Sequence, residues 1–256
     1  MQSRFLIQKQ AKGESHAVID CLNGLPVSVL GRHLIGLPQD MAEDVRRTME
    51  DVAVPRAPQA GVADRPAPFS MLSPQARHER SEQLLCAGLS DVARWTDLRN
   101  LAHAWDARAA ALAPLIDAPD RVLDLGCGAM ALERALRPGV VYMPADLVRR
   151  DERTLVFDVN AGPLPDADAD VVTGLGFLEY VQAPDAFFAA ARRWPRLILT
   201  YNPADLDMGR DRRSHGWFND LTVADVVAIA VTAGFSLVAL IPFDARQRIF
   251  DFQRAV

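Results

Sequence analysis

With 256 residues, 50% of them hydrophobic and 24% charged, the chain has the length and composition of one α/β domain with a complete core and a modest appendage. Its net charge of −5 and its pI near 5.5 give no long-range attraction to phosphate backbones, so we expect no nucleic-acid partner. No apolar run approaches the roughly 20 residues that span a bilayer, so we also expect no membrane partner.

The three cysteines, Cys21, Cys86 and Cys127, are odd in number and far apart. Metal and redox sites need closely spaced cysteines, so this pattern predicts no metal site and fits a reducing compartment. The apolar run Phe5–Ile7 is too short for a signal sequence. We therefore expect a cytoplasmic protein.

The N-terminal residues combine short apolar runs with one helical stretch. The runs are Ala17–Ile19 and Val27–Leu30, and the helix is predicted from Asp40 to Met49. This pattern predicts a small β-rich extension over residues 1–53. Its role stays open, and we consider it a candidate surface for a protein partner.

Five prolines fall between Val54 and Pro74. Because proline lacks a backbone donor and fixes φ, a segment of this kind predicts an extended linker. We therefore divide the chain into the extension 1–53, a Pro-rich linker 54–75 and a main domain 76–256.

Strands and helices alternate through the main domain. Apolar residues spaced by three and four predict an amphipathic helix from Thr96 to Leu112, which Pro114 ends. Apolar runs connected by helical crossovers then predict a mostly parallel sheet. The predicted strands are 121–125, 140–143, 155–157, 170–173 and 197–200, and the predicted helices are 129–136 and 184–193.

The C-terminal part closes this sheet. Thr222, with Asp225 three positions later, predicts the start of a helix that ends at Gly234. Two strands follow, Ser236–Phe243 and Arg248–Gln253, and four residues join them. Such a short connection cannot make a parallel crossover, so the last two strands must form an antiparallel hairpin.

The strand at 121–125 ends in an acidic residue followed by a Gly-x-Gly turn. Asp124 precedes Gly126-Cys127-Gly128, and this segment resembles the first motif of Rossmann-like (class I) S-adenosylmethionine-dependent methyltransferases. The resemblance covers roughly Thr96 to Val256. It implies S-adenosylmethionine as cofactor and an α/β fold, a Rossmann-like seven-stranded mostly parallel sheet with an antiparallel C-terminal strand, so that 76–256 is a methyltransferase domain.

The glycines have a physical reason in this turn, because they remove Cβ atoms where the backbone must turn sharply and approach a ligand. The helix expected from Ala129 directs amides at the cofactor's carboxylate. A dinucleotide fits the Gly126-x-Gly128-x-x-Ala131 pattern as well. Asp124 argues against it, because a carboxylate there repels a pyrophosphate and attracts the ammonium of a methionyl group.

Further cofactor contacts are expected at the ends of three later strands. Asp146, followed by Leu147, is placed to accept hydrogen bonds from the ribose hydroxyls, as this architecture implies. The resemblance also implies that Asp158, with Val159, contacts the adenine and that Gly174 and Leu175 line the cofactor near its methyl group. A turn-forming role remains the alternative for Asp158, and Glu179 is predicted to cap or brace a helix.

Two residues are candidates for catalysis. Tyr201 follows the fifth strand and is expected to face the substrate, and His215 lies in an Arg-rich loop that we interpret as a substrate lid. His215 would act as a base if the acceptor is protonated. For His215 a surface or packing role is the alternative.

The function predicted from these residues is methyl transfer from S-adenosylmethionine to a small molecule or biosynthetic intermediate. Two other functions stay open. One is a non-catalytic cofactor-binding module that assembles with a partner enzyme. The other is an NAD-dependent oxidoreductase, which only the Gly-x-Gly-x-x-Ala pattern favours.

Overall fold

The computed structural model describes residues 5–10, 14–21, 24–29, 32–53, 68–101 and 105–255. By their contacts these residues form two compact units. Unit 1 holds the described residues up to Asn100, together with Asn160–Gly162 and Arg213–Gly216. Unit 2 holds Leu101–Val159, Pro163–Arg212 and Trp217 onward.

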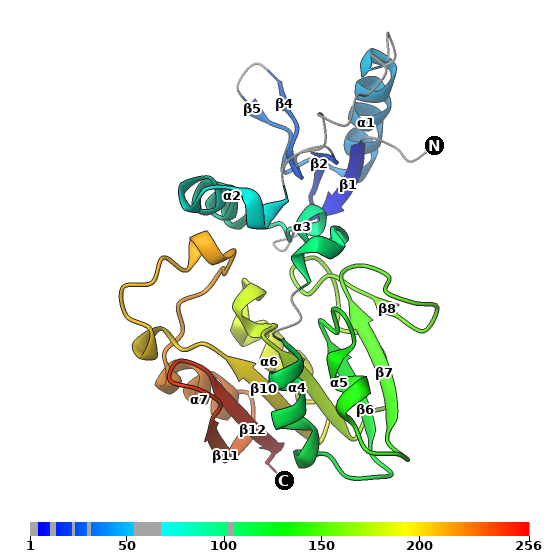
Figure 1. Cartoon of the computed structure of the whole chain (residues 1–256). Coiled ribbons are helices and arrows are strands. Elements are labelled where there is room, and N and C mark those ends of the chain that lie inside the picture. Colours follow the sequence, from blue (N-terminus) through cyan, green and yellow to red (C-terminus); the bar gives the residue numbers. More distant parts are fainter. Residues whose placement is uncertain are drawn as a thin grey trace. The chain divides into compact units, whose positions relative to one another are not determined.

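A seven-stranded sheet forms the centre of unit 2, with the strand order β11-β12-β10-β9-β6-β7-β8 (Figure 1). Strand β12 pairs antiparallel with both β10 and β11, and every other neighbouring pair is parallel. This order confirms the predicted mostly parallel sheet and its antiparallel C-terminal strand. The strands are β6 (Arg121–Leu125), β7 (Val141–Asp146), β8 (Leu155–Val156), β9 (Val171–Leu175), β10 (Arg196–Tyr201), β11 (Phe235–Pro242) and β12 (Arg248–Arg254).

Helices cover both faces of this sheet, and each face has its own apolar cluster. On one face, Phe188 and Ala230 come from helices and pack with the strand residue Leu123. On the other, Leu112 and Leu132 pack with Val122. The helices of unit 2 are α4 (Trp105–Leu112), α5 (Ala131–Ala135), α6 (Pro184–Ala191) and α7 (Val223–Thr232), with short 3-10 turns η3 (Ala113–Leu115), η4 (Leu178–Tyr180) and η5 (Ala204–Leu206).

The capping residues predicted for α7 are confirmed. The Thr222 side chain accepts a hydrogen bond from the Asp225 amide, and the Asp225 carboxylate accepts one from the Thr222 amide. This reciprocal pair satisfies two donors that the first turn of a helix leaves without partners.

The single helix predicted from Thr96 to Leu112 is wrong. Helix α3 (Val92–Thr96) ends before Asp97, whose backbone is extended, and α4 begins only at Trp105. The Asp97 carboxylate accepts hydrogen bonds from both the backbone and the guanidinium of Arg99. Such local side-chain bonds compete with helical ones, which explains the break.

Unit 1 begins with a small antiparallel sheet, of strand order β1-β2-β3, next to helix α1 (Figure 1). Phe5, Val18, Val27 and Ala42 form its buried core. The structure thus contains the β-rich element and the helix predicted within 1–53; Leu30 lies outside the described residues. The elements are β1 (Phe5–Lys9), β2 (His16–Asp20), β3 (Leu25–Pro26), β4 (Ser28–Val29), β5 (Arg32–His33) and α1 (Gln39–Ala53).

Further helical elements complete unit 1. They are η1 (Phe69–Met71), α2 (Pro74–Ala87), α3, η2 (Leu98–Asn100) and η6 (Arg213–His215). Most of the predicted linker, residues 54–67, lies outside the described residues. The last two residues of the predicted linker, Pro74 and Gln75, form the start of α2. Residues 76–100, which the sequence analysis placed in the main domain, group with unit 1.

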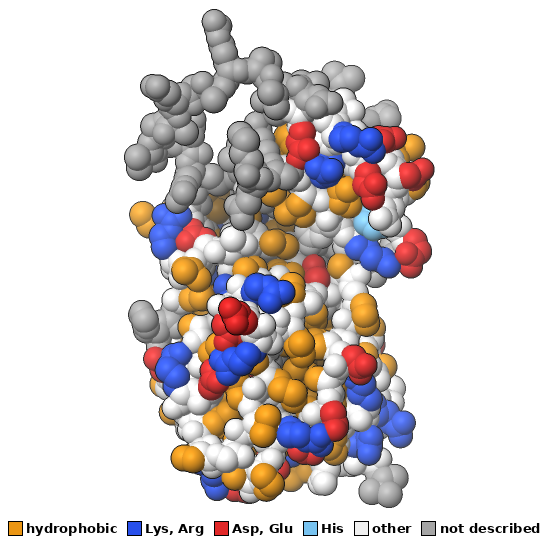
Figure 2. Space-filling model, turned by 90° about the vertical axis from the view of Figure 1, so that its right-hand side faces the viewer, with side chains coloured by type: hydrophobic (Ala, Val, Ile, Leu, Met, Phe, Trp, Pro, Cys, Tyr) orange, Lys and Arg blue, Asp and Glu red, His pale blue; other side chains and the backbone are white. Residues whose placement is uncertain are grey.

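Among the described segments, no helix has the length and apolar character needed to cross a membrane. Lys and Arg side chains lie next to Asp and Glu side chains on the face drawn in Figure 2, so this face shows no extended basic field.

Candidate functional site

The predicted cofactor residues of unit 2 lie at one edge of its sheet. Strands β6, β7 and β9 run parallel, so their carboxyl ends meet there. The chain continues from β6 to β7 on one side and returns to β9 on the other side of β6. Ligands of open α/β sheets bind at such a switch point.

The turn after β6 has the backbone that the motif predicts. Gly126 and Gly128 have φ of +71° and +51°, and Met130 has φ of +54°. The amides of Gly126 and Cys127 both donate to the carbonyl of Ala145, at 2.8 and 3.1 Å. The turn is therefore fastened to the end of β7, in the left-handed conformation that glycine adopts without strain.

The two glycines have different neighbours. A Cβ on Gly126 would lie 2.9 Å from the Phe177 ring, so packing within the protein alone requires a glycine there. A Cβ on Gly128 would meet Trp105 at 3.7 Å, an ordinary contact. The helix expected from Ala129 is shorter than predicted, since α5 has only five residues, and we draw no argument from its dipole.

Asp124 faces the protein interior. Its carboxylate accepts hydrogen bonds from the Tyr142 hydroxyl at 2.7 Å and the Thr173 hydroxyl at 2.9 Å, and the residue is 3% exposed. Burial raises the pKa of this carboxyl to about 6. The geometry favours a role in joining β6, β7 and β9, and contact with a ligand ammonium stays a prediction.

Asp146 lies beside the glycine turn. One carboxylate oxygen accepts a hydrogen bond from the Gly128 amide at 2.8 Å, and the other accepts from the Val148 amide and the Arg150 guanidinium, both at 3.0 Å. Cys127 is buried, with its Sγ 3.9 Å from this carboxylate. Arg150 is a partner that sequence reasoning missed; its position four residues after Asp146 was the available signal. Leu147 is half-buried at the same corner.

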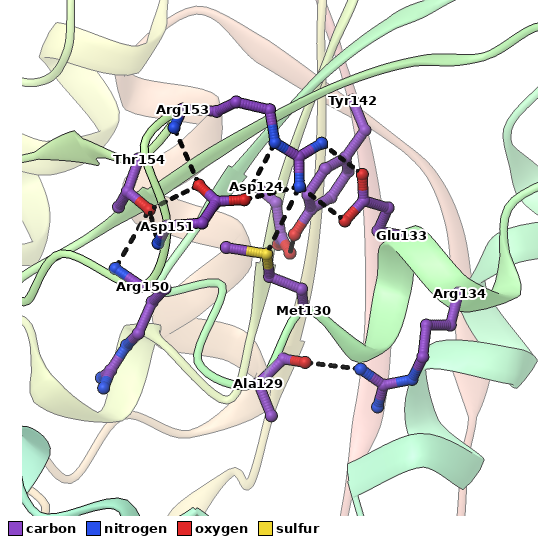
Figure 3. A network of polar contacts seen from close by, with 10 residues as sticks. All are labelled: Asp124, Ala129, Met130, Glu133, Arg134, Tyr142, Arg150, Asp151, Arg153 and Thr154. Carbon is purple, nitrogen blue, oxygen red and sulfur yellow. Dashed lines mark hydrogen bonds and ion pairs between the residues drawn. The ribbon is translucent and has the colours of Figure 1, made fainter.

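Ion pairs hold the segment after β7 next to α5, as Figure 3 shows. The Arg153 guanidinium donates to Glu133 on α5 at 2.5 Å and to Asp151 at 2.6 Å. The Thr154 hydroxyl accepts from the amides of Asp151 and Arg150. These contacts fix the backbone that carries Arg150 toward Asp146.

The expected adenine segment follows β8. Asp158 and Val159 are half-buried, in the loop after that strand. The preceding residue, Phe157, has its ring centroid 6.1 Å from that of Phe177, the residue that packs on Gly126. The adenine contact itself stays a prediction.

At the end of β9, Gly174 is buried against Leu199, and the carbonyl of Leu175 accepts a hydrogen bond from Arg108 at 2.9 Å. Arg108 comes from α4, and its Nε is buried with no hydrogen-bond partner among the described residues. The neighbouring Gly176 has φ of +66°, and its missing side chain leaves room for the guanidinium. The sequence offered no local signal for this arginine, because 67 positions separate the two partners.

Glu179 lies in η4, next to these residues in the chain. Its Oε1 accepts hydrogen bonds from the backbone and side-chain nitrogens of Asn202, at 3.1 and 2.9 Å. Glu179 was predicted to cap or brace a helix; in the structure it holds Asn202, the residue that follows β10. Its Oε2 is buried and has no hydrogen-bond partner among the described residues.

Tyr201 is completely buried at the end of β10. Its hydroxyl donates to Asn219 Oδ1 at 2.6 Å and accepts from Arg212 at 2.8 Å and from the Leu221 amide at 3.0 Å. Burial raises its pKa, so the hydroxyl stays protonated at neutral pH. This geometry favours a packing role for Tyr201, and its catalytic role stays a prediction.

His215 is in η6 and belongs to unit 1, whereas the predicted cofactor residues belong to unit 2. Its carbonyl accepts a hydrogen bond from Arg94 at 2.9 Å, and the adjacent Arg213 donates to Glu82 on α2 at 2.9 Å. The loop interpreted as a lid is therefore packed on α2 and α3 at this point. A catalytic role for the imidazole stays a prediction.

Within the described ranges, no group of three or more His, Cys, Asp or Glu side chains could hold a metal ion. The polar groups at the strand ends are instead suited to an organic ligand. Carboxylates accept from hydroxyls and ammonium groups, and a guanidinium binds carboxylates.

No protein-family model matches this sequence, and no curated protein matches it. Solved structures do resemble it. The [4+2]-cyclase SpnF has a TM-score of 0.50 and 16% identity, over 60% of this chain and 82% of its own. The methyltransferase CcbJ from Streptomyces caelestis has a TM-score of 0.48 and 14% identity, over 59% of this chain and 90% of its own. The pyocyanin biosynthetic protein PhzM has a TM-score of 0.48 and 15% identity, over 72% of this chain and 62% of its own.

At these identities the likeness shows the fold alone. The comparison with SpnF and the strand order of unit 2 support this fold. Both agree with the Rossmann-like sheet that the sequence predicts.

Proposed function

We propose that this chain transfers a methyl group from S-adenosylmethionine to a small molecule or biosynthetic intermediate. The observation that carries the proposal is the contact between Asp146 and the Gly128 amide, at 2.8 Å, where β6 and β7 end beside the switch point of the sheet. A carboxylate at that position, next to a side-chain-free turn, suits the ribose of an adenosyl ligand.

The donors and acceptors at this edge fit the other parts of that cofactor. Arg108 has a buried Nε without a hydrogen-bond partner among the described residues, and it would supply the cation that the ligand's carboxylate needs. Asp146 would share its oxygens between the ribose hydroxyls and Arg150. The half-buried Asp158 and Val159 would meet the adenine, with Gly174 and Leu175 beside the sulfonium.

When bound, the cofactor would supply an activated methyl group. The residues of the chain then orient the two reactants and exclude water, because a methyl transfer in line with its leaving group depends mainly on position. Arg108 and the glycine turn would fix the methionyl end, while Asp146 fixes the ribose.

The fold does not decide this function, since SpnF, which shares it, is named a [4+2]-cyclase. The non-catalytic module that assembles with a partner therefore remains the second candidate. Exposed apolar side chains in unit 1 favour it, because Met41 is 51% and Met71 is 76% exposed. Such a module would bind the cofactor without yielding a methylated product.

Isothermal titration with S-adenosylhomocysteine tests the proposal. We expect the wild-type protein to bind it, Asp146→Ala to weaken binding at least tenfold, and the exposed control Asp166→Ala to leave it unchanged. No binding by the wild type would remove the proposal. A fluorescence change with NADH instead would favour the oxidoreductase, and cofactor binding without methyl transfer into a cell extract would favour the module.

A further inference from the structure

Glu179 is a buried carboxylate with one oxygen in use. The residue is 1% exposed, and the backbone and side-chain nitrogens of Asn202 both donate to Oε1. Oε2 is buried without a partner among the described residues. A buried acceptor that is left unsatisfied costs folding free energy, so its retention calls for an explanation.

The surroundings of Glu179 hold it in one orientation. Asn202, which binds Oε1, has its carbonyl fixed by Arg212 at 2.8 Å. Asn219 donates to the carbonyls of Leu178, the first residue of η4, and of Val181, which follows η4, at 2.6 and 3.0 Å. The Phe218 amide donates to the Glu179 carbonyl at 2.7 Å. The carboxylate is therefore held in one orientation, while Oε2 has no hydrogen-bond partner among the described residues; a reacting group has to be pre-oriented in this way.

Glu179 is four residues beyond Leu175, at the sheet edge that the proposed function assigns to the cofactor. The charged and titratable groups that act on it are Arg108, from α4, and Tyr201, from β10. Burial raises the pKa of Glu179, and the bonds from Asn202 and the charge of Arg108 oppose that rise. A carboxylate whose pKa is raised is a better proton acceptor than an exposed one.

We infer that Glu179 Oε2 binds the nucleophile of the methyl acceptor and takes its proton, so that the acceptor is a protic compound, an alcohol, phenol or amine. The inference rests on the proposed function and deepens it. The acceptor's O–H or N–H donates to Oε2. As its lone pair forms the bond to the methyl carbon, the carbon–sulfur bond breaks, that electron pair stays on sulfur, and the proton moves to Oε2. The positive charge of the sulfonium and the negative charge of Glu179 are both lost in this step.

The first measurement separates Glu179 from the cofactor site. Glu179→Gln keeps the shape of the side chain and removes the charge, and Glu79→Gln, an exposed position on α2, is the matched control. We expect both variants to bind S-adenosylhomocysteine within threefold of the wild type. A tenfold loss in Glu179→Gln alone would make Glu179 a cofactor residue and overturn the inference. Failure of the wild type to bind would instead remove the proposed function.

The second measurement needs no turnover. Each protein, saturated with S-adenosylhomocysteine, is dialysed to equilibrium against the deproteinised small-molecule extract of the source cells, and retained compounds are identified by mass spectrometry. We expect the wild type and Glu79→Gln to retain compounds with a hydroxyl or amine, and Glu179→Gln to retain at least tenfold less of them. Equal retention, or retained compounds without such groups, contradicts the inference.

The third measurement follows transfer of a labelled methyl group into the same extract. We expect Glu179→Gln to lower the rate at least a hundredfold and to abolish the rise of the wild-type rate with pH, and formate to restore part of the rate of Glu179→Ala. A purely structural role would give neither the lost pH dependence nor the rescue. If Glu179→Gln does not fold, Glu179→Asp replaces it; a wild-type rate in Glu179→Asp would overturn the inference.

Discussion

The guanidinium of Arg150 donates to the carboxylate of Asp146 at 3.0 Å, and both side chains are only 6% exposed. The residue proposed to bind the ribose thus already has a buried cation as partner. The pair holds the Asp146 carboxylate in one orientation, and a ligand hydroxyl has to share the carboxylate with Arg150.

Arg150→Gln should lower the free energy of unfolding by about 3 kcal/mol, because it leaves the Asp146 charge buried with amide partners only. Urea denaturation measures this. The neighbouring Arg149 is exposed, and Arg149→Gln should change stability by less than about 0.5 kcal/mol. Equal stability of both variants would show that the Asp146–Arg150 pair contributes little.

Arg108→Gln should weaken the binding of S-adenosylhomocysteine at least tenfold, because the ligand's carboxylate loses its cation. The same variant should bind 5′-methylthioadenosine like the wild type, since that nucleoside lacks the amino-acid group. Titration calorimetry with both ligands separates the two parts of the site. An equal loss of affinity for both ligands would mean that Arg108 does not bind the amino-acid group of the cofactor.

Asp124 makes stability depend on pH. Its pKa is raised to about 6 from 3.8 by burial, so the folded protein disfavours the ionised form. The neutral carboxyl of Asp124 contributes its full stability below about pH 4. This contribution is lost as the pH rises to about 6, because the folded protein then has to hold a buried charge. Asp124→Asn removes this ionisation, so its stability relative to the wild type should increase by about 3 kcal/mol from pH 4 to pH 8.

Urea denaturation at a series of pH values measures the effect of Asp124→Asn. The exposed control Asp166→Asn should show no comparable trend. If the difference in free energy of unfolding between Asp124→Asn and the wild type is the same at every pH, ionisation of Asp124 does not destabilise the folded protein.

Tyr201→Phe distinguishes support from catalysis. Removing the hydroxyl deprives Asn219, Arg212 and the Leu221 amide of one hydrogen bond each, and the first two are buried, so we expect a loss of about 2 kcal/mol in stability. Binding of S-adenosylhomocysteine should stay within threefold of the wild type, because none of those partners is a predicted cofactor residue. An unchanged stability combined with a large loss of methyl transfer would restore the catalytic role predicted from the sequence.

Most strands of the sheet could be predicted because buried parallel strands form continuous apolar runs. The predicted strand 121–125 is β6 as observed. The break at Asp97 could not be predicted from apolar spacing, because the hydrogen bonds of one side chain caused it. Leu98, counted as part of the buried face, is 70% exposed.

The candidate site divides in the same way. The glycine turn and Asp146 follow from local spacing, so the sequence was enough to place them. The positions of Arg108 and of Glu179 Oε2 depend on contacts between segments that are far apart in the sequence. A local sequence pattern cannot predict such contacts. Asp124 was expected to meet a ligand, and its hydrogen bonds to Tyr142 and Thr173 on the neighbouring strands became evident only in the structure.

Strand β12 comes last in the sequence, yet it lies between β10 and β11. Phe250 pairs with Leu199 on one side and with Leu240 on the other. While the ribosome is still synthesising Arg248–Arg254, the nascent chain has no strand to join these two edges. Completion of this sheet therefore has to wait until that segment has left the exit tunnel.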